Sequence, residues 1–354
     1  MKPTDARVAQ RGRIDVRRYT DADRERWESF VERCPDATFF HRIGWETVLE
    51  DVFRHRTHYL LAEREGSVVG VLPLAEVKTA LFGHALCSLP FAVYGGVAAT
   101  DAEAVAALHR EAESIAQALG VQHLELRNRD SREPDWPRQE LYVTFRKEIL
   151  PEVEANLLAI PRKQRAMVRK GIRNGLVSEI DSTVDRFFRL YADNVRRHGT
   201  PALPRHYFET LQRVFGADCE VLIVRDAGGE PVSGVLTFYF RDEVLPYYAG
   251  DLVRARELAA NDFKYWELMR RACERGYKVF DYGRSKRGSG AFDFKKNWGF
   301  APTPLHYEYR LYKRETVPQN NPDNPRYRAF IALWRRLPLP VANTLGPYLV
   351  RGLG

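Results

Sequence analysis

Residues 279–300, VFDYGRSKRGSGAFDFKKNWGF, carry the most informative pattern of the chain. An apolar, strand-like run breaks here into a glycine-rich loop with several cations and ends on an aromatic residue. Glycines allow backbone N–H groups to turn toward a ligand, and cationic side chains supply compensating charge. Ser289 and Gly290 stand where a Walker A loop has Lys and Ser or Thr. The segment therefore predicts an anion-binding loop that is not a nucleotide P-loop, or else a solvated turn with surface cations.

The two halves of the chain repeat one order of segments. Residues 59–74 and 221–240 each read as two strands around a turn. Downstream, Tyr94-Gly-Gly matches Tyr248-Ala-Gly, and each is followed by a helical pattern, a glycine and a short strand. Repetition on this scale indicates tandem domains rather than a solenoid. We predict an α/β (α+β) fold of two tandem GNAT-like (acyl-CoA N-acyltransferase-type) domains, with mixed sheets flanked by helices.

The predicted organisation has four parts. Residues 1–17 form a basic flexible N-terminus, 18–150 the first GNAT-like domain, and 151–316 the second, which opens with a basic linking helix. Residues 317–354 form a Pro-rich linker and an amphipathic tail. The length of 354 residues fits about two domains.

Charge and composition restrict the partners. A net charge of +8 favours an anionic partner, such as tRNA, a phosphorylated substrate, CoA or an anionic membrane face. The four cysteines are far apart and lack a CxxC pair, so we interpret them as reduced thiols. Neither a signal peptide nor an apolar run of about 18 residues is present, so we expect a cytoplasmic protein.

Three segments resemble FemAB-type aminoacyltransferases: IPRKQRAMVRKGIRNGL at 160–176, ANDFKYWELMRRACERGY at 260–277, and residues 280–300. The resemblance covers roughly residues 18–312 and extends to the FemAB-like proteins associated with exosortase (PEP-CTERM) and exopolysaccharide loci in Gram-negative bacteria. It implies a transferase, and the relatives proper add amino acids from aminoacyl-tRNA to a peptidoglycan precursor. Our leading hypothesis is that the chain moves an aminoacyl or acyl group onto an amine or hydroxyl of a phosphorylated or lipid-linked cell-envelope or exopolysaccharide precursor.

Two features depart from that family and from CoA-dependent enzymes. The link between the halves is short and lacks a coiled-coil arm, and residues 250–262 replace the glycine-rich pyrophosphate loop of a CoA site. We therefore expect no tightly bound cofactor, and the donor stays open between aminoacyl-tRNA and acyl-CoA. A non-catalytic adaptor of an exopolysaccharide assembly system is the third alternative.

The resemblance also assigns roles to residues in the last segment. Lys295 matches the lysine of the family's Phe-Lys-x-x-(Phe/Trp)-Gly element and is expected to stabilise an oxyanion, with Lys296 and Arg284 on substrate phosphate. Asp281 is the candidate base, although its duplicated counterpart Glu125 favours a structural role. The other candidates for substrate binding are Ser285, Lys286, Trp298, Tyr247, Tyr248 and Asn261.

Several of these residues have simpler explanations. Asn261 is also the expected cap of the helix that begins there, and Trp266 is expected in its core face. Tyr247 and Tyr248 are equally compatible with a buried sheet. His55 and His58 lack a third ligand, so we assign no metal. A nucleophile elbow is also missing, which favours direct attack without a covalent enzyme intermediate.

The basic linking segment places Arg162, Arg165, Arg169 and Arg173 at helical spacing on one face. Arg165 and Arg169 are our candidates for contacts to tRNA phosphates or a nucleotide-linked precursor, and a solvated helix is the alternative. We predict no DNA partner.

The tail joins apolar runs to Trp334, Arg335 and Arg336, and Pro338 and Pro340 interrupt it before it could cross a bilayer. It either lies peripherally on the inner face of the cell membrane or packs on the body.

Overall fold

The computed structural model describes residues 12–79, 83–318 and 325–352, with the backbone alone at 325–328. β1 already begins at Ile14, before the predicted boundary at residue 18, because its residues pair with β3. The elements of the first half are β1 (Ile14–Arg18), α1 (Arg24–Arg33), α2 (Gly44–Phe53), β2 (Arg56–Thr57), β3 (Leu60–Arg64), β4 (Ser67–Leu72), β5 (Leu74–Thr79), β6 (Gly83–Ser88), β7 (Ala98–Ala99), α3 (Ala102–Leu119), β8 (His123–Asn128), β9 (Arg138–Gln139) and β10 (Tyr142–Glu148).

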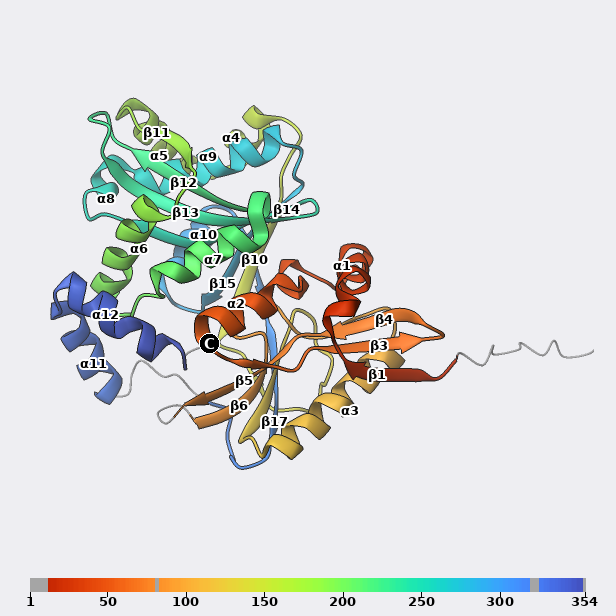
Figure 1. The fold of residues 1–354 in the computed structure, drawn as a ribbon. Coiled ribbons are helices and arrows are strands. Elements are labelled where there is room, and N and C mark those ends of the chain that lie inside the picture. The colour runs from red at the N-terminus through yellow and green to blue at the C-terminus, as the bar shows by residue number, and fades with distance from the viewer. Residues whose placement is uncertain (1–11, 80–82, 319–324, 353–354) are drawn as a thin grey trace, which may run out of the picture.

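The second half repeats this order after a helical link (Figure 1). Its elements are α4 (Val153–Ala159), α5 (Arg162–Arg173), β11 (Val177–Asp181), α6 (Asp185–His198), α7 (Arg205–Phe215), β12 (Cys219–Arg225), β13 (Pro231–Phe240), β14 (Glu243–Asp251), α8 (Ala255–Leu258), α9 (Ala260–Glu274), β15 (Val279–Lys286), α10 (Gly290–Asn297), β16 (Pro302–Pro304), β17 (His306–Leu311), α11 (Pro325–Arg336) and α12 (Leu339–Val350).

The two halves exchange strands. The seven-stranded sheet has the order β11-β12-β13-β14-β15-β10-β16, so that β10 from the first half completes the sheet of the second. The six-stranded sheet, β2-β5-β6-β8-β17-β9, receives β17 from the second half in return. A smaller sheet, β1-β3-β4-β7, continues the first half. Each unit predicted from the sequence thus contributes one strand to the other.

The largest hydrophobic core also joins the two halves. Phe39 of the first half stacks on Phe238 of β13 with ring centroids 4.3 Å apart, and both rings are buried. Such aromatic pairs contribute about 0.5–1.5 kcal/mol beyond their area burial. The predicted core position of Trp266, on α9, is confirmed, since the ring is buried against the other face of the second sheet. The interface between the halves is therefore part of the core.

The link and the tail both form helices. The basic linking segment forms a helix as expected, and this helix, α5, packs against α9 through Val168 and Gly171. α11 and α12 lie beside α6 (Figure 1, blue), with Trp334 and Val350 buried. The tail thus packs on the body through one face. In the described ranges, no helix is long and apolar enough to span a membrane.

Gly250 marks a close approach of β14 to α6. A Cβ at this position would lie 2.4 Å from the backbone nitrogen of Tyr191 and 2.5 Å from the carbonyl carbon of Leu190. Because backbone atoms cannot move aside as a flexible side chain can, we expect Gly250→Ala to lower the free energy of unfolding by about 1–3 kcal/mol. Urea denaturation measures this loss.

Gly290→Ala provides the matched control. Gly290 is the first residue of α10 and has open space around its Cα. Alanine there is expected to leave stability unchanged or raise it by about 0.4–1 kcal/mol. Equal unfolding midpoints of the two variants would contradict the close-approach argument.

Candidate functional site

A cavity opens where β14 and β15 diverge. These strands run parallel and pair only at Glu243 with Val279 and at Val244 with Phe280. Beyond these pairs the strands separate and leave a cavity of about 460 Å³. Its wall comes from both halves and from the tail: Phe91, Val93, Tyr191, Thr200, Pro201, Leu203, Pro246, Tyr247, Tyr248, Tyr265, Tyr282, Gly283, Arg284, Ala291, Lys295 and Val350.

The lining combines aromatic rings with two cations. Tyr247, Tyr248, Arg284 and Lys295, all candidates from the sequence, line this cavity. No Asp or Glu is among the described residues of the wall. The cavity therefore suits an anionic ligand that carries an apolar or ring-shaped group.

Arg284 presents an unneutralised charge to this cavity. Its Cζ lies 4.7 Å from the ring centroid of Tyr142 and 5.8 Å from that of Tyr307. Its only hydrogen bond among the described residues is a long one, 3.4 Å from Nη1 to the hydroxyl of Tyr307, and no carboxylate is within ion-pair distance. A guanidinium held by stacking keeps its N–H donors available for a phosphate or carboxylate.

Lys295, on α10, reaches back to the end of β15. Its Nζ donates to the carbonyl oxygens of Tyr282, Gly283 and Arg284 at 2.7, 3.2 and 3.1 Å. An ammonium group has three N–H donors, and here the backbone takes them all. To stabilise an oxyanion, the ammonium group of Lys295 would therefore have to break one of these three hydrogen bonds. The neutral amine keeps two N–H donors and has a lone pair that can accept a proton.

Burial lowers the pKa of Lys295 to about 7; the carboxylate of Asp281 opposes this shift and the guanidinium of Arg284 adds to it. We therefore expect Lys295 to react with an amine-acylating reagent with a midpoint near pH 7, measured by competitive labelling and mass spectrometry. Because the unfolded lysine binds its proton up to about pH 10.4, the shift also makes folding stability rise with pH from about 7 to about 10. A labelling midpoint near the ordinary lysine value would contradict this prediction.

Asp281 does not line the cavity. Its side chain is fully buried and accepts hydrogen bonds from Arg146 Nη1 at 2.7 Å, the Tyr94 hydroxyl at 3.0 Å and the backbone N–H of Gly283 at 2.7 Å. Arg146 is shared with Glu243 of β14. These contacts favour the structural role that the duplication suggested, because the carboxylate is already saturated by its donors.

A strained loop from the first half forms one wall of the cavity. The hydroxyl of Tyr247 donates to the carbonyl of Phe91 at 2.8 Å, and the hydroxyl of Tyr307 donates to the carbonyl of Val93 at 2.7 Å. Phe91 has φ 67°, a conformation that bulky residues rarely adopt. Tyr248 is bonded to Tyr207, with 2.8 Å between their hydroxyl oxygens. The two predicted tyrosines therefore both line the cavity and hold its walls.

The remaining candidates lie outside the cavity wall. The ring of Trp298 is fully buried and its Nε1 donates to Asp262 at 2.9 Å, so the residue predicted to contact substrate is not part of the cavity wall in this structure. The cap predicted at Asn261 is wrong, because Ala259, in the left-handed conformation, precedes the helix. Ser285 is buried, and Lys286 follows it at the end of β15. Lys296 is exposed over the Phe292 ring.

Arg165 and Arg169 lie on α5 and do not reach the cavity. Arg165 donates to the carbonyl of Leu158 at 2.8 Å, and Arg169 is exposed. In the part of the chain that the structure describes, none of the α5 cations forms an ion pair: Arg162, Lys163, Arg165, Arg169, Lys170 and Arg173. The helix therefore presents a basic face separate from the cavity.

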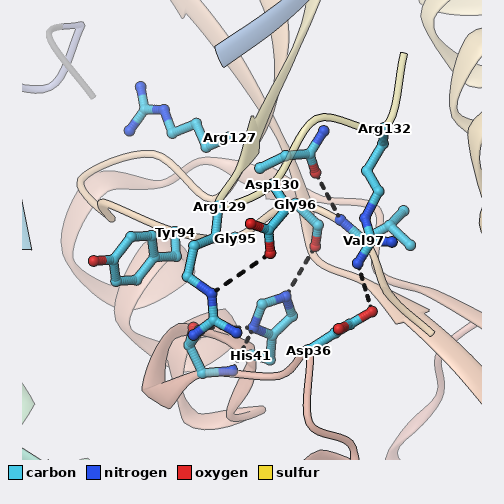
Figure 2. Close-up of a pocket in the computed structure, with 12 residues that line it drawn as sticks. Asp36, His41, Tyr94, Gly95, Gly96, Val97, Arg127, Arg129, Asp130 and Arg132 are labelled. Carbon is cyan, nitrogen blue, oxygen red and sulfur yellow. Dashed lines mark hydrogen bonds and ion pairs between the residues drawn. The ribbon is translucent and has the colours of Figure 1, made fainter. Parts of the chain in front are cut away.

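The equivalent position in the first half is almost closed (Figure 2). There the cavity is about 20 Å³, room for about one water. Asn128 occupies it, since a Cβ on Gly96 would lie 1.8 Å from its Oδ1. His41 donates through Nε2 to the carbonyl of Gly96 at 2.9 Å and accepts at Nδ1 from the N–H of Thr38, and burial lowers its pKa to about 4. These side chains pack against one another instead of leaving space for a ligand.

Sequence reasoning missed the walls supplied by distant segments. The cavity is lined, without any sequence motif, by Phe91, Thr200, Pro201, Leu203 and Val350 of α12. One signal in the sequence was available: residues 89–96, LPFAVYGG, are the counterpart in the first half of the strand segment that carries Tyr247 and Tyr248. Tyr265 and Tyr282 lie in the segments 260–277 and 280–300 described above. Whether their side chains face the cavity depends on the tertiary structure.

Comparison with known proteins agrees with this architecture. Residues 162–296 match the model of the acetyltransferase (GNAT) domain. The structure of FemX superposes with a TM-score of 0.64 and 15% identity, over 84% of this chain and 98% of that one. A tandem GNAT protein from the clavulanic acid biosynthesis pathway gives a TM-score of 0.54 and 11% identity, over 86% and 100% of the two chains. The fold is that of a tandem GNAT protein.

One curated relative gives a sequence match. UDP-N-acetylmuramoylpentapeptide-lysine N(6)-alanyltransferase from Weissella viridescens is 25% identical over 105 residues, which are 29% of this chain and 31% of the relative. The chain thus spans about a third of the length of that relative. The predicted fold class is confirmed, and the matches agree with a GNAT-type transferase distantly similar to the FemAB family.

Proposed function

We propose that the chain is a transferase that moves an aminoacyl or acyl group onto an amine or hydroxyl of a cell-envelope or exopolysaccharide precursor, in the cavity between β14 and β15. The observation that carries this proposal is the guanidinium of Arg284, which has no ion-pair partner among the described residues and lies beside Lys295 on a wall whose described residues include no Asp or Glu. The equivalent position in the first half leaves only about 20 Å³, which supports placing the reactive centre in the second half.

Direct attack suits the groups that are present. The acceptor nitrogen or oxygen attacks the carbonyl carbon of the donor ester, and Lys295 in its neutral form takes the proton. Arg284 then stabilises the oxyanion or an adjacent phosphate. The tetrahedral intermediate collapses, the bond from carbon to the leaving oxygen or sulfur breaks, and Lys295 returns the proton to the leaving group. Asp281 positions the end of β15 and is not the base.

A cysteine nucleophile is disfavoured by burial. All four thiols are buried, and this raises the pKa of each, that of Cys87 to about 12. None of them is among the residues that line the cavity. Since the thiolate is the reactive form, a covalent acyl-enzyme on cysteine is not supported.

Aminoacyl-tRNA is the donor that we propose first. The relative from Weissella viridescens is named as an alanyltransferase, and the unpaired cations of α5, including Arg165 and Arg169, could contact the tRNA backbone. The acceptor would be a phosphorylated or lipid-linked precursor, which would place the protein in the cytoplasm or at the inner face of the cell membrane. An acyl-CoA donor is the second candidate, favoured by the match of residues 162–296 to the acetyltransferase domain.

Transfer of label distinguishes the donors. Purified protein is incubated with envelope precursors extracted from cells and with either tRNA charged with labelled amino acids or labelled acetyl-CoA. We expect label to reach the precursor from charged tRNA, and Arg284→Gln to abolish this transfer. Transfer from acetyl-CoA alone would establish the second donor. Absence of transfer from both would overturn the enzyme proposal and favour the adaptor.

A further inference from the structure

The outer face of the C-terminal helices is apolar, although the tail packs on the body. α12 buries Ala342, Gly346 and Val350 on one side. On the opposite side it exposes Val341, Leu345 and Tyr348, at 42, 47 and 81% of their surface, and α11 exposes 64% of Leu333. The spacing of these residues places Val341, Leu345 and Tyr348 on one helical stripe. We call the stripe of Val341, Leu345 and Tyr348 the tail face.

The charged side chains of the C-terminal helices are all positive. Residues 325–352 contain arginines and no Asp or Glu. Arg335, Arg336 and Arg351 are exposed, and Arg335 and Arg351 also donate to the carbonyls of His198 and Arg54, each at 3.4 Å. An apolar stripe flanked by cations, with tyrosine at its edge, is the composition of helices that lie in the interface of an anionic bilayer.

The helices are held firmly against the body. Arg196 of α6 donates to the carbonyl of Arg335 at 3.0 Å, and Trp334 is buried. At Gly346, a Cβ would lie 2.9 Å from the carbonyl oxygen of Ala202, so α12 contacts the loop at 200–203 closely. The tail face is therefore a preformed surface and not a segment that must fold on contact.

The same helix borders the cavity. Val350 of α12 lines it, together with Thr200, Pro201 and Leu203 of the loop on which α12 packs. We propose that the tail face docks on an anionic lipid bilayer and seats the cavity beside it, so that a lipid-linked acceptor enters from the membrane surface. The choice of acceptor rests on the proposed function, whereas the docking itself does not.

Vesicle flotation of the full chain tests the docking. We expect the protein to float with vesicles of phosphatidylcholine and phosphatidylglycerol but not with phosphatidylcholine alone. R335E/R336E should weaken the partition at least about 25-fold, since each basic residue near an anionic surface contributes about 5-fold. L345D/Y348D should abolish flotation, because it places charge on the apolar stripe. Val253→Asp, at a residue 70% exposed and outside the tail, is the matched control that should float as the wild type does.

Three results would overturn the proposal. The first is a wild type that does not float with anionic vesicles, and the second is normal flotation of both tail variants. The third is loss of flotation in R165E/R169E on α5 while the tail variants still float. Light scattering adds a fourth, a dimer that L345D/Y348D dissociates, which would identify a second copy of the chain as the occupant. Transfer to a water-soluble precursor, measured in the same preparations, shows separately whether the cavity is active.

Discussion

Lys295→Met is expected to lower kcat/KM for transfer by about 10²- to 10⁴-fold, the usual contribution of a general base. Methionine has nearly the shape of the lysine stem but cannot accept the proton of the attacking group. In the wild type, kcat/KM should rise with pH and level off above about 7, because burial lowers the pKa of Lys295 to about that value and only the amine can act as base. The variant should lack this rise.

The pH profile distinguishes the two roles considered for Lys295. If kcat/KM of the wild type falls above pH 7, the ammonium form is the active one and Lys295 stabilises the oxyanion instead. Lys78→Met, which removes an exposed lysine of β5 far along the chain from α10, should leave the rate unchanged. The free energy of unfolding of each variant shows whether a lost rate reflects lost folding, which would contradict a catalytic role.

The fold could be predicted because the duplication is visible in short features. Strand pairs, Tyr-x-Gly triplets and helix-ending glycines repeat in order, and each has a local physical cause. The exchange of β10 and β17 could not be predicted in this way. The alternation of apolar and polar residues shows that a strand has a buried face, but it does not show which strand is its neighbour in the sheet. Which half each strand completes is decided by the packing of the whole chain.

The site was only partly predictable from the period of its strand. Side chains alternate across a regular strand, which would place Asp281 and Arg284 on opposite faces. β15 instead has a bulge, because Arg284 pairs with Thr144 and Asp281 with Arg146, and Gly283 has φ 61°. The bulge brings Asp281 and Arg284 to the same side of the sheet, but only Arg284 lines the cavity, since Asp281 is buried against Arg146 and Tyr94. Gly283 was the one local signal of this bulge. Trp298, by contrast, required the position of Asp262 on α9, which no local pattern supplies.

Asp281→Asn should lower the free energy of unfolding by about 3–5 kcal/mol, the cost of breaking a buried ion pair by removing one partner. The wild-type carboxylate is fully buried and binds Arg146, Tyr94 and the N–H of Gly283 at once. An amide has one acceptor oxygen, so its NH2 group would face a donor and leave Arg146 without full compensation. Urea denaturation measures the loss, and Asp135→Asn, at an exposed carboxylate, should change stability by less than about 0.5 kcal/mol.

This substitution also separates a structural carboxylate from a catalytic one. Tyr94 belongs to the first half, Arg146 lies on the exchanged strand β10, and Asp281 lies on β15 of the second half. A structural role predicts that kcat/KM of Asp281→Asn still rises with pH, with a midpoint below that of the wild type because the carboxylate no longer raises the pKa of Lys295, and that activity is lost only as far as the variant unfolds. If the variant instead folds like the wild type and is inactive, Asp281 is the base, and Lys295 must supply charge alone. In that case the buried network of Tyr94, Arg146 and Asp281 would surround a reacting group between the two halves. Its role would not be to hold the end of β15 in place for Arg284 and Lys295.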